Sequence, residues 1–180
     1  MHAFRTMTLL VFLTLLDIAV RLTPHTPNCT PIAATALFAV ALLDNWWLAG
    51  LVPIIAMGVT DFFIGVYDWR VMLTVYAALV FPVILGPYVR GNRSPIRVLP
   101  CALVSSVFFF IATNFGVWCF TSLYAPDLGG LLQCYRAAVP FFKNTVIGDL
   151  FWTSALFGTY AIVSGMHRSA SLHLAAERQI

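Results

Sequence analysis

Long apolar runs with very few charged residues constrain the fold of this chain more than any other feature of its sequence. Only 9% of the 180 residues are charged, whereas soluble domains carry about 25%. In lipid, backbone polar groups are satisfied only within helices or closed barrels. The apolar runs are too long, and alternate too little, to be barrel strands. We therefore expect an all-α integral membrane protein.

The runs predict a six-transmembrane-helix bundle that forms a single domain, residues 1–180. The expected spans cover about residues 6–22, 31–44, 46–66, 70–89, 98–123 and 139–166. The first is kept as a membrane helix because no small-residue cleavage site follows it, as one would in a signal peptide. Pro82 predicts a kink in the fourth. Residues 166–180 are expected to form a short amphipathic surface helix or a frayed end.

The basic residues predict the orientation of the bundle. Arg90, Arg93 and Arg97 lie in a short turn between the fourth and fifth helices. Clusters of this kind favour the cytoplasmic side of a membrane. We therefore expect both termini to be cytoplasmic. The loops at 21–31 and 124–138 then share the outer face.

Composition and motifs exclude several classes of function. A formal net charge of +3 without a basic stripe gives no indication of nucleic-acid binding. The four cysteines are scattered without a C-x-x-C pair, so no metal site is predicted. Phosphate-binding glycine loops, metalloprotease helices and serine-nucleophile elbows have no counterpart in the sequence. We predict a protein that is not an enzyme and has no cofactor; a membrane enzyme using Cys29 or Cys134 is the weaker alternative.

The polar loop from residue 21 to residue 30 is the first candidate for a functional centre. Three prolines restrict its backbone and make it stiff, although it carries Arg21, His25 and Asn28. A rigid polar loop between two membrane helices is able to cover a pocket. It leads directly into an alanine-rich helix, whose small residues permit close contact with a partner subunit or with a neighbouring helix of the same chain.

Polar residues inside the spans also need an explanation, because ionisable groups are costly in lipid. Asp17 and Arg21 are four residues apart and suit a local ion pair. Asp61 is expected to pair with Arg21 or to reach water or ligand. Asn114, which lies among phenylalanines, needs either an interhelical hydrogen bond or a bound solute.

The outer end of the sixth helix carries a second polar group. Lys143 and Asn144 follow an apolar aromatic stretch, and Asp149 lies six residues after Lys143. Tyr135, in the preceding loop, either closes over a pocket or anchors the loop in the headgroups. Lys143 either contacts the solute or extends to the membrane surface, as long basic side chains commonly do.

Several motifs together resemble a family of uncharacterised bacterial membrane transport proteins that is defined as a domain of unknown function. The motifs are the proline loop with Pro31-Ile32-Ala33-Ala34, Asp61–Gly65, Thr113–Trp118, Gly130–Tyr135 and Pro140–Asp149. More loosely, the chain is similar to the biotin-type S-components of energy-coupling-factor transporters. That similarity implies an S-component-like fold in the bacterial inner membrane, with the proline loop as lid and a coupling protein with two ATPases as partners.

These observations lead to one functional hypothesis and one rival. The first is a substrate-binding membrane subunit for uptake of a small vitamin-like or carboxylate-bearing solute at the outer face. Its expected binding residues are Arg21, His25, Asn28, Asn114, Tyr135, Lys143 and Asn144. The rival is an accessory subunit of a larger membrane complex. In both cases membrane lipids surround the protein.

Overall fold

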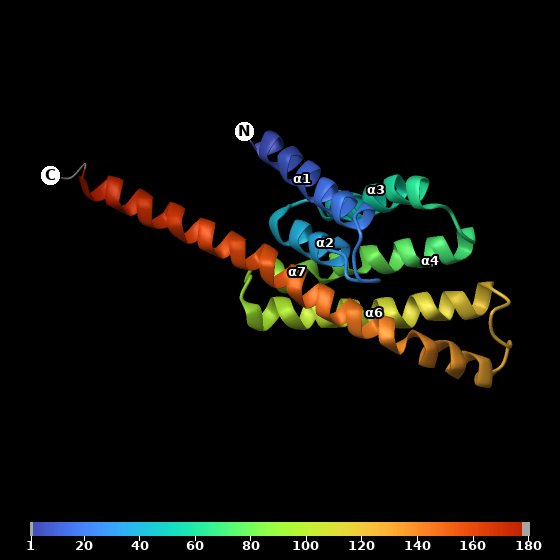
Figure 1. Ribbon diagram of the computed structural model, residues 1–180. Helices are drawn as coiled ribbons and strands as arrows, with labels where there is room; N and C mark the ends of the chain where they lie inside the picture. The colour runs from blue at the N-terminus through green and yellow to red at the C-terminus, as the bar shows by residue number, and fades with distance from the viewer. Residues whose placement is uncertain (1, 178–180) are drawn as a thin grey trace.

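The computed structural model describes residues 2–177, which fold into helices joined by short loops (Figure 1). The helices are α1 (His2–Leu22), α2 (Ile32–Leu42), α3 (Trp46–Ile64), α4 (Trp69–Val80), the 3₁₀ helix η1 (Phe81–Leu85), α5 (Gly86–Arg90), α6 (Pro95–Phe120) and α7 (Leu128–Glu177). The all-α prediction is confirmed for these residues.

Five of the described helical segments have the length and composition to cross a membrane, as expected of a multi-pass membrane protein. They are Ala3–Leu22, Trp46–Ile64, Trp69–Arg90, Pro95–Phe120 and Leu128–Met166. Helix α2 is the exception, because its 11 residues extend only about 16 Å and a hydrocarbon core is about 30 Å thick. The second predicted span, residues 31–44, is therefore a helix, but not one that crosses a bilayer by itself.

Helix α2 forms the centre of the molecule. Nine of its 11 residues are buried, and it packs against α1, α3, α4, η1, α5, α6 and α7. Its alanines allow this close approach. On the facing element, a Cβ added at Gly86 would lie 2.6 Å from a methyl group of Val40, so glycine is needed there. The small residues of α2 thus meet neighbouring helices of the same chain, which was one of the two expected arrangements.

Arginines at the end of α5 and in the turn that follows it hold the C-terminal end of α2. Arg93 donates from Nε and Nη2 to the carbonyl oxygen of Ala41, at 3.0 and 2.7 Å. Arg90 donates from Nε to the carbonyl oxygen of Val40 at 3.3 Å. The last carbonyls of a helix lack intrahelical partners and carry a partial negative charge. The arginines that predict orientation therefore also have a structural role.

At Pro82, where a kink was predicted, the fourth span changes from α-helix to the 3₁₀ helix η1. The prediction of a polar loop at 124–138 is wrong for most of these residues, because α7 begins at Leu128. Asp127 explains the early start: its carboxylate accepts a 2.7 Å hydrogen bond from the backbone N–H of Gly130.

Helix α7 is also longer than predicted. It runs across the bundle beside α6, and its C-terminal part continues beyond the other helices (Figure 1). The tail prediction for residues 166–180 is therefore replaced, as far as residue 177, by a direct continuation of α7. Residues 178–180 lie outside the described part of the chain.

Candidate functional site

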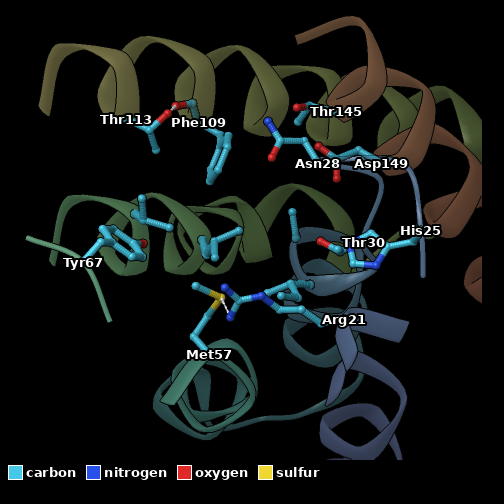
Figure 2. A pocket seen from close by; sticks show the side chains of 14 residues that line it. Arg21, His25, Asn28, Thr30, Met57, Tyr67, Phe109, Thr113, Thr145 and Asp149 are labelled. Atoms are coloured by element: carbon cyan, nitrogen blue, oxygen red, sulfur yellow. Dashed lines mark hydrogen bonds between the residues drawn. The ribbon is translucent and has the colours of Figure 1, made fainter. Parts of the chain in front are cut away.

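A cavity of about 310 Å³ lies at the N-terminal end of α2 (Figure 2). Its walls come from α1, the loop between α1 and α2, the first turn of α2, α3, the loop before α4, α4, α6 and α7. Its polar lining residues are Arg21, His25, Asn28, Thr30, Tyr67, Thr113, Thr145 and Asp149, and its apolar ones are Ile32, Ala33, Met57, Val75, Leu79 and Phe109. Ligand sites commonly combine an apolar wall with a few converging polar groups.

A smaller cavity of about 130 Å³ adjoins the first and shares four lining residues with it. The shared residues are Asn28, Phe109, Thr113 and Thr145. The smaller cavity extends the space between α6 and α7 and adds Asn114 to the polar lining. The loop residue Asn28 therefore lies at the junction of both spaces.

The proline loop is held against α7. Cys29 donates its backbone N–H to the carbonyl oxygen of Thr26 at 3.0 Å, and Asn28 has a left-handed φ of 61°, which asparagine tolerates better than most residues. A Cβ at Gly148 would lie 2.9 Å from the Cα of Cys29. The missing side chain at Gly148 thus lets the loop pack closely on α7 and form one end of the cavity.

Arg21 forms an ion pair with Asp61 of α3 at the cavity wall. Its Nη2 donates to Oδ1 of Asp61 at 2.6 Å, and its Nη1 donates to the hydroxyl of Thr60 and the sulfur of Met57. The second oxygen of Asp61 accepts a 2.7 Å hydrogen bond from the hydroxyl of Tyr76. The predicted Arg21–Asp61 pair is confirmed.

The local pair between Asp17 and Arg21 does not form. Because α3 packs on α1, Asp61 takes the guanidinium group instead. Asp17 is fully buried, its Oδ2 accepts a 2.8 Å hydrogen bond from the hydroxyl of Thr35, and its Oδ1 has no partner among the described residues. Asp17 therefore links α1 to α2 outside the cavity lining.

Asp149 is the buried carboxylate of the cavity. It is 5% exposed, and its Oδ2 accepts a 2.6 Å hydrogen bond from the hydroxyl of Ser106 on α6. Thr145, four residues earlier on the same face of α7, also lines the cavity. The spacing of these two residues was a signal available in the sequence, although Asp149 was not among the predicted binding residues.

Of the other predicted residues, His25 and Asn28 line the cavity with Arg21. The Nδ1 of His25 lies 2.7 Å from the carbonyl oxygen of Thr23. Asn114 lines the smaller cavity. Its amide donates to the carbonyl oxygen of Phe110 in the same helix at 2.7 Å, so the interhelical hydrogen bond expected of it is not formed.

Tyr135, Lys143 and Asn144 lie outside the lining of both cavities. The hydroxyl of Tyr135 donates to the carbonyl oxygen of Ile111 at 2.8 Å and ties α7 to α6. Lys143 is exposed and Asn144 is half-buried. Lys143 precedes Thr145 by two residues, or about 200° around a helix, so the two side chains point to opposite sides of α7.

Sequence reasoning missed the lining residues contributed by the long apolar helices and by the loop before α4. Tyr67, in that loop, faces the cavity. Burial and the nearby Asp61 carboxylate raise the pKa of the Tyr67 phenol above its ordinary value, which keeps it a neutral hydrogen-bonding group at physiological pH. Among the described residues, His, Cys, Asp and Glu form no group of three able to hold a metal ion.

The chain belongs to DUF6580, a family of unknown function, whose family model matches residues 2–172. The prediction of a family defined as a domain of unknown function is thereby confirmed. No curated protein and no solved structure matches the chain. The similarity to S-components of energy-coupling-factor transporters therefore has no support from a relative or a structural neighbour.

Proposed function

We propose that the protein is a membrane-embedded subunit that binds a small solute in the 310 Å³ cavity for uptake. The observation that carries this proposal is the convergence of free polar side chains on one space. Asn28, Thr30 and Tyr67 line the cavity and make no side-chain hydrogen bond to another described residue. Asn28 and Tyr67 are exposed and Thr30 is half-buried, so their polar groups are accessible, and a bound solute would hydrogen-bond to them.

The N-terminal end of α2 supports the same proposal. Ile32 and Ala33, in its first turn, line the cavity. Pro31 at the N-cap provides no side-chain hydrogen bond to the helix. The first N–H groups of a helix lack intrahelical acceptors and carry partial positive charge. A hydrogen-bond acceptor on the solute would fit at this end of the cavity.

The charges in the cavity alter the expected chemistry of the solute. A carboxylate-bearing solute would need a free cation, such as Arg21 or Lys143, in the cavity. Arg21 is neutralised by Asp61 at 2.6 Å, and Lys143 lies outside the lining of both cavities. We therefore propose a small, vitamin-sized solute that does not need to carry a carboxylate.

Thermal stabilisation of the purified protein across a panel of vitamins and their precursors tests this function. We expect at least one compound to raise the melting temperature. The same compound should lose its effect in Ala33→Leu, which fills the cavity, and keep it in Ala77→Leu, which adds the same bulk at an exposed position of α4. A folded protein that no compound stabilises, or a stabilisation that survives Ala33→Leu, would contradict the proposal.

One observation favours the rival hypothesis, an accessory subunit that docks in a larger membrane complex. The part of α7 that continues beyond the bundle (Figure 1) exposes Ile162, Val163 and Met166. Purification in a mild detergent distinguishes the alternatives. A stable stoichiometric complex that is lost when Ile162 and Met166 are changed to serine would favour docking, whereas recovery of the single chain would not.

A further inference from the structure

The cavity contains a carboxylate that no cation of the described chain neutralises. Asp149 lines the cavity and is 5% exposed. Its Oδ2 accepts the hydroxyl of Ser106, while its Oδ1 accepts no hydrogen bond from another described residue. Because Oδ1 is not among the fully buried unpartnered atoms, it is open to the cavity.

The other charged and titratable groups around the cavity do not pair with Asp149. Arg21 is bound to Asp61, and His25 contacts the carbonyl oxygen of Thr23. Tyr67 lies at the opposite end of the cavity from Asp149 (Figure 2). The two ion pairs found among the described residues, Arg21–Asp61 and Arg70–Asp68, leave Asp149 out. An ionised carboxylate that is buried in a membrane protein is costly unless a cation compensates its charge.

We propose that the solute carries a protonated nitrogen, an amine or an amidine, and that this group binds Oδ1 of Asp149. The inference rests on the proposed function, because it assigns a chemical class to the solute of the same cavity. A charge-assisted hydrogen bond is stronger than one between neutral groups. It would therefore orient the solute with its cationic end against α7.

The residues next to Asp149 suit such a group. Thr145 lies four residues away on the same face of α7, and Asn28 is brought close by the packing of Cys29 on Gly148. Figure 2 shows these oxygen-bearing side chains directed to the same end of the cavity as Asp149. Phe109 adds an aromatic ring to the wall, and aromatic faces attract cations. The remaining wall, with Val75 and Leu79, is suited to contact an apolar part of the solute.

Matched compounds that differ only in one group test the inference. Suitable sets are pyridoxamine, pyridoxine and 4-pyridoxate, and benzylamine, benzyl alcohol and benzoate, measured by calorimetry and thermal shift on the detergent-purified full chain. We expect the amine of a set to bind ~10- to 100-fold more tightly than its alcohol, as for a hydrogen bond to a charged group. In Asp149→Asn, whose amide oxygen can still accept the hydroxyl of Ser106, this preference should disappear while alcohol binding remains.

Two further variants keep the test specific. Asp44→Asn removes an exposed carboxylate on another loop and should leave the preference unchanged. Ser106→Ala removes the hydrogen bond to Asp149 but keeps the charge, so the preference should persist in weakened form. If Asp149 only ties α7 to α6, then both Ser106→Ala and Asp149→Asn will lower the melting temperature and neither will change the selectivity, which would overturn the inference.

The remaining outcomes separate this inference from the proposed function. Alcohols or carboxylates that bind as tightly as the amines, or a vitamin bound in the cavity without a cationic nitrogen, would overturn the inference and leave the proposed function in place. A folded protein that binds neither the matched compounds nor any member of the vitamin panel would overturn both.

Discussion

The Arg21–Asp61 pair joins α1 to α3 in a setting where either charge alone would be costly. Asp61 is 2% exposed, and its two oxygens accept hydrogen bonds from Arg21 and Tyr76. The guanidinium of Arg21 reaches Thr60 and Met57 as well. Removing one partner of a buried pair leaves an uncompensated charge, which is more harmful than removing both.

Arg21→Met is therefore expected to lower the free energy of unfolding by about 3–5 kcal/mol. The double variant Arg21→Met with Asp61→Leu should recover most of this loss, because no buried charge is left behind. Denaturant unfolding of the protein in detergent micelles measures both changes. As a control, Arg70→Met breaks the exposed pair with Asp68 and should have little effect. A single variant as stable as the wild type would show that Arg21 does not hold the two helices together.

At the scale of secondary-structure elements, α2 links the cavity to the arginines that follow α4 in the chain. Its N-terminal end borders the cavity, and its C-terminal carbonyls accept hydrogen bonds from Arg90 and Arg93. The guanidinium of Arg93 also lies 5.5 Å from the ring centre of Tyr160 on α7. The first turn of α2 lines the cavity, so the shape of the cavity depends on the arginines that hold the C-terminal end of this helix.

Arg93→Met should destabilise the protein by about 1.5–3 kcal/mol, the range for hydrogen bonds to charged groups. The loss has two sources, the freed carbonyl of Ala41 and the lost contact with Tyr160. Arg97→Met, at an exposed position in the same basic cluster, is the matched control and should change stability little. Equal losses in both variants would mean that the cluster acts through its overall charge and not by capping α2. Thermal unfolding in detergent distinguishes the two cases.

The sequence predicted the positions of the helices better than it predicted which face of each helix points inward. Apolar runs and prolines located the helices and the kink at Pro82, because length and backbone restriction act locally. The cavity residues of the proline loop, Arg21, His25 and Asn28, were also predicted, since a polar loop stands out between apolar runs. Residues such as Phe109 and Asp149 were missed. Phe109 lies in a mostly apolar stretch of α6, where the sequence carries no clear periodicity that shows which face points inward. For Asp149 the four-residue spacing from Thr145 was available, but it was not used.

At the scale of the whole molecule, the proline loop and α2 together return the chain from one end of the bundle to the other. Helix α2 is too short to do so alone. Arg21 at the end of α1 reaches Thr60 and Asp61 near the end of α3, whereas the end of α2 reaches Arg93 before α6. The turns at 43–45 and 91–94 therefore lie at one end, and the loops at 65–68 and 121–127 at the other.

This arrangement makes the predicted orientation testable with single cysteines in a cysteine-free background. Asp44→Cys and Asn92→Cys should react with a membrane-impermeant maleimide only after cells are permeabilised, because the arginine cluster favours the cytoplasm. Leu123→Cys, at a position 73% exposed in the opposite loop, should react in intact cells. If Asp44→Cys reacts like Leu123→Cys, α2 does not return the chain across the membrane. If all three patterns are reversed, the cavity opens toward the cytoplasm, and a role in uptake from outside would not fit the structure.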